Sequence, residues 1–248
     1  MELGLTGRTA IVCGASSGIG LAVAEALVAE GANVAMFARR RDVLEREAER
    51  LGALAVRGDV ADPADLDRLV QRTVAAFGGV DILVNNSGGP TPGPAAGVTA
   101  EQLEGAFNLL LQSKVRLTNL CLPYLEQSGR GRIINLESST VREPIDNLAL
   151  SNIVRAAVVG WSKTLSREVG PKGITVNTIA TGKIATDRLR SLVGDESKLA
   201  KLAAEIPARR IGRPEDMADL VCFLASERAA YISGTVIPVD GGLGRGLL

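Results

Sequence analysis

The chain has 248 residues with 28 basic and 28 acidic side chains, so it carries no net charge and lacks the basic balance expected of a surface made for nucleic acid or anionic lipid. Histidine is absent, which excludes Ser-His and Cys-His nucleophiles and the commonest zinc ligand. The first residues lack a secretory signal, and no run of about 18 apolar residues follows, so we expect a cytoplasmic protein without membrane partners.

Seven short apolar runs rich in β-formers predict buried strands. They are Thr9–Cys13, Val34–Phe37, Leu54–Val56, Ile82–Val84, Ile133–Leu136, Thr175–Ile179 and Val236–Val239. The segments between them place apolar residues three and four apart, as in crossover helices. This alternation predicts one α/β domain over residues 1–248: a doubly wound, Rossmann-type fold with about seven mainly parallel strands and helices on both faces.

Two stretches do not fit this alternation. Gly88–Gly97 is rich in glycine and proline, and Gly182–Pro207 is polar and only weakly helical. We expect both to be loops around a ligand cleft, the second as a substrate loop. Cys13, Cys121 and Cys222 lie far apart in apolar strings, which favours reduced core thiols over disulfides or a metal cluster.

The first predicted strand runs into a glycine-rich turn that is followed at once by a helix pattern. The turn contains Gly14, Ser16, Ser17, Gly18, Ile19 and Gly20. Glycines permit a tight turn and a close approach to a pyrophosphate, and the helix N-terminus offers free N–H groups and a positive dipole end. Isolated glycines often serve only as turn residues, but the strand before and the helix after favour a dinucleotide site.

The segment after the second strand distinguishes two nicotinamide dinucleotides. An acidic residue there binds the ribose hydroxyl of NAD, but this chain has Arg39, Arg40 and Arg41. Guanidinium groups suit a 2'-phosphate, so we expect NADP, with NAD the less favoured cofactor. The alternative interpretation is a solvated helix start, which applies to Arg41 and is open for one of the other two arginines.

The glycine turn, the run Asn85–Gly88, and the endings at 212–216 and 239–242 together resemble the short-chain dehydrogenase/reductases over nearly the whole chain. Within that family the chain looks most like the bacterial 3-oxoacyl-(acyl carrier protein) reductases. The resemblance implies a homotetramer with helices near 101–123 and 147–170 between subunits. It further implies three cofactor contacts: Asp59 and Val60 at the adenine, Asn86 and Gly88 along the adenosine side, and Ile184 and Thr186 at the nicotinamide carboxamide.

The family's catalytic set is matched only in part. Asn108 and Ser138 occupy the positions of its Asn and Ser, where the resemblance implies that they orient substrate and water. The Tyr-x3-Lys pair is replaced by Ser151 and Arg155. A serine hydroxyl is a far poorer acid than an activated phenol, whereas arginine supplies a permanent charge that would hold the nicotinamide ribose.

Other polar residues offer weaker candidates. Lys183 would lie near the nicotinamide end as a proton donor or anion contact, although a solvent-facing loop lysine is the alternative. Arg142 and Glu143 are candidate substrate contacts with equally ordinary surface interpretations. Tyr124 falls past the expected end of its helix, and we assign it and Tyr231 to structure.

Three functions remain open at this point. The first is an NADP-dependent oxidoreductase that acts on a small-molecule carbonyl or alcohol with an atypical proton source. The second is a dinucleotide-binding protein with weak or no dehydrogenase activity, such as a sensor or partner subunit. The third is another reaction on the same scaffold, since a fold does not set its function.

Overall fold

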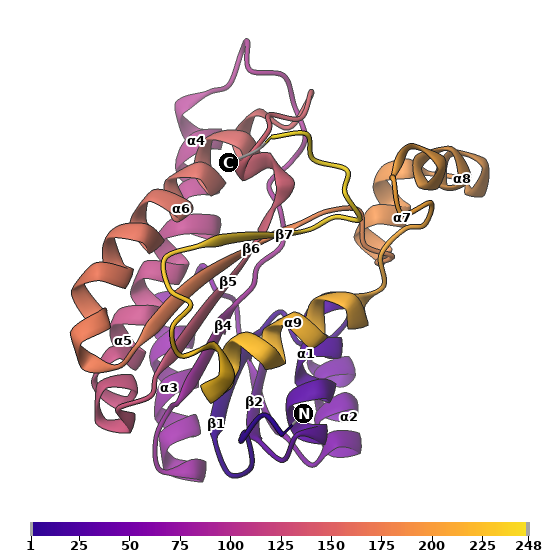
Figure 1. Ribbon diagram of the computed structural model, residues 1–248. Coiled ribbons are helices and arrows are strands. Elements are labelled where there is room, and N and C mark those ends of the chain that lie inside the picture. The colour runs from indigo at the N-terminus through magenta and orange to yellow at the C-terminus, as the bar shows by residue number, and fades with distance from the viewer. Residues whose placement is uncertain (1, 247–248) are drawn as a thin grey trace.

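The computed structural model describes residues 2–246 and contains a seven-stranded parallel sheet (Figure 1). The strand order is β3-β2-β1-β4-β5-β6-β7. Successive strands are added on one side of β1 as far as β3 and then on its other side from β4 to β7, so the order of addition reverses between β1 and β4. The strands are β1 (Thr9–Cys13), β2 (Asn33–Ala38), β3 (Leu54–Arg57), β4 (Ile82–Asn85), β5 (Arg132–Ser138), β6 (Thr175–Thr181) and β7 (Val236–Val239). All seven predicted strands are therefore confirmed, and the sheet is of the doubly wound type.

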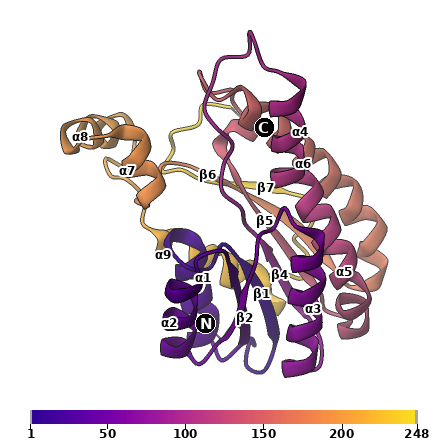
Figure 2. The same ribbon diagram turned by 180° about the vertical axis from the view of Figure 1, so that it is seen from behind.

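Helices cover both faces of the sheet (Figure 2). One face is packed by α1 (Gly18–Ala29), α2 (Arg41–Leu51) and α9 (Pro214–Ala225). The other is packed by α3 (Pro63–Phe77), α5 (Ser113–Ser128) and α6 (Ala149–Val169), with α4 (Ala100–Phe107) near its upper end. Successive β1 side chains alternate between the two layers: Val12 packs with α1 and α9, whereas Ile11 packs with α3 and α5. The core is thus divided in two by the sheet.

The segment 182–207 differs from the expected loop because it contains two helices, α7 (Asp187–Val193) and α8 (Glu196–Glu205). Each begins at a side-chain cap: Thr186 Oγ1 accepts from the Leu189 N–H (3.3 Å) and Asp195 Oδ1 accepts from the Lys198 N–H (2.8 Å). Capping stabilises short helices whose sequence shows little apolar periodicity. Both helices stand out from the body of the molecule in Figure 1.

The helix expected over 101–123 also differs, because α4 and α5 are joined by a π-helical turn at Asn108–Gln112 and α5 continues past Pro123 to Ser128. Tyr124 therefore lies inside α5 and packs partly buried on the core. Tyr231, in contrast, is completely exposed, so it contributes nothing to the core. Within residues 2–246, none of the helices combines the length and hydropathy needed to cross a bilayer.

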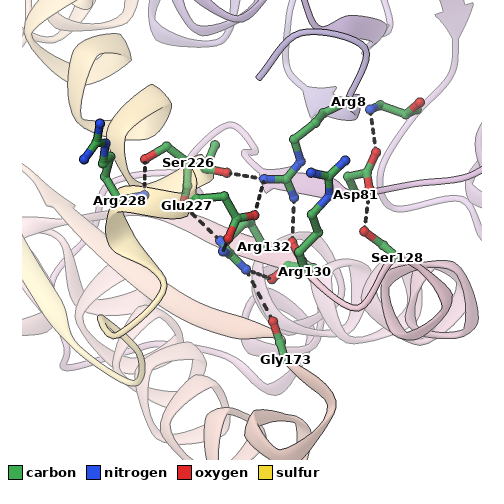
Figure 3. A network of polar contacts seen from close by, with 12 residues as sticks. Arg8, Asp81, Ser128, Arg130, Arg132, Gly173, Ser226, Glu227 and Arg228 are labelled. Atoms are coloured by element: carbon green, nitrogen blue, oxygen red, sulfur yellow. Dashed lines mark hydrogen bonds and ion pairs between the residues drawn. The ribbon is translucent and has the colours of Figure 1, made fainter. Parts of the chain in front are cut away.

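A polar network ties the amino ends of several strands together (Figure 3). Arg8, completely buried, donates to the carbonyls of Ala225 (2.8 Å) and Arg130 (2.5 Å), and burial lowers its pKa to about 10. Arg132 donates to Ser226 (3.3 Å) and to other carbonyls nearby. These contacts anchor the end of α9 at the edge of the sheet where the strands begin. Parallel α/β sheets bind ligands at the other edge, where the strands end.

Candidate active site at the carboxyl edge of the sheet

A cleft of about 370 Å³ opens where β1, β4, β5 and β6 end, beside the point at which the strand order reverses. Parallel α/β sheets bind ligands in this crevice because loops diverge there. The sequence-predicted residues that line it are Gly14, Ser17, Gly18, Ile19, Asn86, Gly88, Ser138, Ser151, Arg155, Ile184 and Thr186. The fold thus gathers both the expected cofactor turn and most of the expected catalytic set.

The glycine turn is shaped by close backbone packing. Gly14 has a φ of +63°, and a Cβ there would lie 2.7 Å from the Asn86 amide nitrogen. That nitrogen donates to the Cys13 carbonyl at 3.2 Å, which holds the β4 loop against the turn. A Cβ on Gly20 would overlap the Gly14 carbonyl oxygen. Side chains at either position would push the turn out of shape.

The N-terminus of α1 is available to an anion. Its N-cap, Ser17, makes no side-chain cap hydrogen bond, and the first turn contains no acidic residue. The buried Ser87 hydroxyl in the same cleft has no hydrogen-bond partner among the described residues. Free N–H groups, the helix dipole and an unpartnered hydroxyl together fit the diphosphate and ribose of a dinucleotide.

The three arginines after β2 differ in their contacts. Arg40 donates to the Ser17 hydroxyl at 2.8 Å and reaches Ser16 at 3.5 Å, so a guanidinium lies directly over the glycine turn. Arg39 is exposed, 3.8 Å from the Asp59 carboxylate. Arg41 instead pairs with Glu45 along α2, as the solvated-helix interpretation expected.

The opposite end of the cleft holds the altered catalytic set. Ser138 ends β5, and its hydroxyl accepts from the Thr140 N–H at 3.3 Å. Ser151, in the first turn of α6, lies 3.3 Å from the Thr140 hydroxyl and accepts from Arg155 Nε at 3.2 Å. Ser151 and Arg155, four residues apart, therefore stay in contact on one face of the helix.

Arg155 belongs to a buried ionic cluster that the sequence analysis did not identify. Its NH1 donates to Glu137 Oε2 at 2.6 Å, while Lys114 from α5 binds the other oxygen of the same carboxylate. The Glu137 side chain is completely buried and those of Lys114 and Arg155 are nearly so. One carboxylate thus binds two basic side chains, and one of them, Arg155, also contacts Ser151.

Burial lowers the pKa of Lys114, although the Glu137 carboxylate opposes this effect. The available signal for the cluster in the sequence was a charged residue at the end of a predicted buried strand, Glu137 after Leu136, whereas Lys114 lies among polar neighbours and gave no such signal. A charge at such a position predicts a buried partner, but it does not say which one.

Other sequence-predicted residues lie outside the cleft lining. The Asn108 amide donates to the Ala61 carbonyl at 3.3 Å and its oxygen accepts from Arg116 at 3.0 Å. Asp59 accepts from the Ala61 N–H at 3.0 Å, and Val60 packs partly buried beside α3. The roles proposed for all three stay predictions.

The weaker candidates divide between the cleft and the C-terminal segment. Lys183 lines the cleft. Glu143 accepts from the backbone of Arg245 and Gly246, at 2.6 Å each, and Arg142 donates to the Gly246 carbonyl at 3.3 Å. The structure thus gives this pair a contact with the C-terminal segment that the sequence pattern did not indicate.

The chain matches known proteins over nearly its whole length. Residues 14–244 match the family described as enoyl-(acyl carrier protein) reductase. The 3-oxoacyl-(acyl-carrier-protein) reductase FabG of Escherichia coli is 37% identical, with 96% of this chain and 97% of that protein covered.

Two solved structures give the same result. L-sorbose reductase of Gluconobacter frateurii, complexed with NADPH and L-sorbose, superposes with a TM-score of 0.94 at 36% identity, and both chains are covered completely. YwfH, an NADPH-dependent reductase of bacilysin biosynthesis, superposes with a TM-score of 0.94 at 30% identity, covering 97% of this chain and 99% of its own. Sequence and fold agree that this chain belongs to the short-chain dehydrogenase/reductase family.

Proposed function

We propose that the protein is an NADP-dependent oxidoreductase that interconverts a small-molecule carbonyl and alcohol, similar to the 3-oxoacyl reductases but with an altered proton-transfer site. Its relatives support this proposal, since two solved members of the family are reductases that use NADPH. The complete glycine turn and the free α1 terminus support it independently.

The chain's own residues have separate roles in this proposal. The cofactor, when bound, supplies or accepts the hydride. Ser138 and Ser151 donate hydrogen bonds to the substrate oxygen, and Asn108 acts through ordered water. Arg155 holds the nicotinamide ribose and adds positive charge near the oxygen, where charge develops during reduction. Because neither serine is a strong acid, the proton comes from solvent or from another group such as Lys183.

The observation that carries the cofactor assignment is the Arg40 guanidinium, held over the glycine turn by Ser17 at 2.8 Å. A 2'-phosphate at this place would gain charge-assisted hydrogen bonds that NADH cannot make. We expect a Kd for NADPH at least tenfold lower than for NADH in a fluorescence titration, a difference of about 1.4 kcal/mol.

Arg40→Gln is expected to remove most of this preference by weakening NADPH alone. Arg41→Gln is the matched control because Arg41 pairs with Glu45 on α2, away from the turn. Equal affinities for NADPH and NADH in the unaltered protein would contradict the cofactor assignment.

The second candidate is a dinucleotide-binding protein with little catalysis. The contact between Arg155 and Glu137 favours it, because this ion pair fixes the arginine that would otherwise be free to serve the ribose and substrate. Tight NADPH binding without oxidation of NADPH by a broad panel of ketones and aldehydes would support this candidate. Turnover of any panel member would support the oxidoreductase.

We also infer that the protein is cytoplasmic and forms a homotetramer through α5 and α6. On α6, Ile153 is 44% exposed, an unusual amount for a large aliphatic side chain, and it stands beside exposed Ala156 and Gly160. Small and apolar residues on one exposed helix face suit a partner helix.

A further inference from the structure

Arg188, in the first turn of α7, crosses the mouth of the cleft to the loop that follows β4. Its two terminal nitrogens reach the carbonyls of Gly89 and Pro90, each at a long 3.4 Å. The guanidinium occupies the space that a Cβ on Gly89 would fill, so it lies directly against the backbone of this loop. The side chain therefore spans the cleft with weak contacts to the protein.

Several exposed arginines of the chain, such as Arg40 and Arg209, contact no described carboxylate, and what distinguishes Arg188 among them is its place in the lining of the cleft. Among the side chains that the structure describes, no carboxylate lies within 4 Å of its guanidinium, although the acidic neighbour Asp187 is 3.4 Å from Arg190. Partial burial and the positive charge of Arg155 lower the pKa of Arg188. A cation placed near a second cation, without a carboxylate, is arranged for an anion that the protein itself does not supply.

The charges around the cleft lead to the same conclusion. Its lining includes three cations, Arg155, Lys183 and Arg188, but the acidic residues there are Glu137 and Asp187. Glu137 already binds buried Lys114, and Asp187 pairs with Arg190, which lies outside the cleft lining. Lys183 and Arg188 thus have no carboxylate partner in the cleft lining, and they belong to the segment whose Thr186 packs against Gly18 of the glycine turn.

We propose that Arg188 binds a carboxylate of the substrate, so that the preferred substrates are oxo acids and the corresponding hydroxy acids. The inference rests on the proposed oxidoreductase function and names its substrate class. In reduction, the hydride of NADPH forms the new C–H bond at the carbonyl carbon, the C=O π bond breaks, and the oxygen takes a proton that originates in solvent. The substrate carboxylate is unchanged, and its contact with Arg188 fixes the orientation of the substrate.

The test compares each acid with its own methyl ester, which keeps the ketone and removes the charge. Pyruvate, acetoacetate and levulinate place the ketone at increasing distance from the carboxylate. We expect the unaltered protein, saturated with NADPH, to show at least tenfold higher kcat/KM for one acid than for its ester. Arg188→Gln should lower kcat/KM for that acid at least tenfold and for the ester less than twofold, with Arg188→Lys between them.

Arg190→Gln is the control, because Arg190 shares α7 and its charge but pairs with Asp187. Equal use of acid and ester, or equal losses in Arg188→Gln, would overturn the proposal. A Kd for NADPH that rises tenfold in Arg188→Gln with an unchanged acid-to-ester ratio would overturn it too, by assigning the anion to the cofactor diphosphate.

A catalytically silent protein can still be tested. If NADPH binds without turnover, calorimetric titration of the NADP complex with lactate, 3-hydroxybutyrate and their methyl esters replaces kinetics. Binding of an acid that is lost in Arg188→Gln supports the carboxylate site, and the absence of acid binding overturns it. Failure to bind NADPH at all would instead contradict the proposed function.

Discussion

In the candidate active site, a hydrogen-bonded serine and arginine, Ser151 and Arg155, stand at the positions where the family has a tyrosine and a lysine. The serine hydroxyl accepts from the arginine, which is fixed in turn by Glu137. Arginine keeps its charge under all ordinary conditions, so under the proposed function this pair would stabilise negative charge on a substrate oxygen without relaying protons. The proposal thus keeps the electrostatic part of the family's chemistry and replaces its acid.

Restoring the pair should therefore restore proton transfer. In the double variant Ser151→Tyr with Arg155→Lys, the phenol would lie beside the introduced ammonium group, because residue 155 contacts residue 151 in this structure, and that charge would lower the phenol pKa from about 10. We expect at least a tenfold gain in kcat for a simple ketone or 3-oxoacyl ester, measured by NADPH oxidation. Ser151→Phe with Arg155→Lys is the control without a hydroxyl, and equal rates in both variants would contradict the role of the phenol.

Among the helices, α9 has the most elaborate N-terminus. Asp216 accepts from the Arg213 N–H at 2.7 Å and binds Arg210 through both oxygens, at 2.5 and 3.1 Å. The hydrogen bonds from Arg210 contribute most to lowering the pKa of the Asp216 carboxyl, and the one from the Arg213 N–H lowers it further. The helix packs along α1, so the position of its N-terminus also affects the helix that follows the glycine turn.

The effect of Asp216 on stability should depend on pH. Since its folded-state pKa lies below the unfolded value near 3.8, the stabilisation is complete above that value and is lost as pH falls through the folded pKa. We expect Asp216→Asn to lower the free energy of unfolding by about 1 kcal/mol at neutral pH, with the difference shrinking below about pH 4.

Urea unfolding of both proteins across that pH range measures this difference. Asp219→Asn, an exposed change on the same helix, is expected to alter the free energy of unfolding by less than about 0.5 kcal/mol. A penalty for Asp216→Asn that stays constant from neutral to acid pH would contradict the electrostatic explanation.

Elements with strong periodicity could be predicted from the sequence, and elements defined by capping could not. The seven strands are continuous apolar runs because both faces are buried, which makes them easy to detect. In contrast, α7 and α8 are short helices that begin at the cap residues Thr186 and Asp195, and the apolar repeat of α8, which includes Leu199 and Leu202, covers too few turns to be distinguished from a loop.

The same contrast holds for the site. The glycine turn is a local sequence feature, so its place at the cleft could be predicted, and Arg40, which follows the next strand, contacts Ser17 of that turn. The Lys114–Glu137–Arg155 cluster joins residues from α5, β5 and α6, and the contact between Arg188 and Gly89 joins residues 99 positions apart. Such contacts are set by the packing of distant elements, which one sequence does not display.

The assembled protein offers a direct test of the proposed tetramer. Ala156→Glu would place a carboxylate on the exposed small-residue face of α6, where contact with a neighbouring helix would bury it without a partner. We expect sedimentation velocity to show a tetramer for the unaltered protein and smaller species for the variant, with unchanged far-ultraviolet circular dichroism.

The matched control is Ala75→Glu, which introduces the same charge at an exposed alanine of α3. Its sedimentation should equal that of the unaltered protein. A monomer before any substitution, or a tetramer that tolerates Ala156→Glu, would contradict assembly through α6.

The three buried cysteines supply a natural set of reporters. Cys13 lies in β1, Cys121 in α5 and Cys222 in α9, which places one thiol in the sheet and one in the helical layer on each side. Burial raises the pKa of all three, to about 12 for Cys13 and Cys222, so an alkylating reagent reacts only after the surrounding layer opens. Mass spectrometry of timed alkylation would therefore give separate opening rates for the three layers without any engineered label.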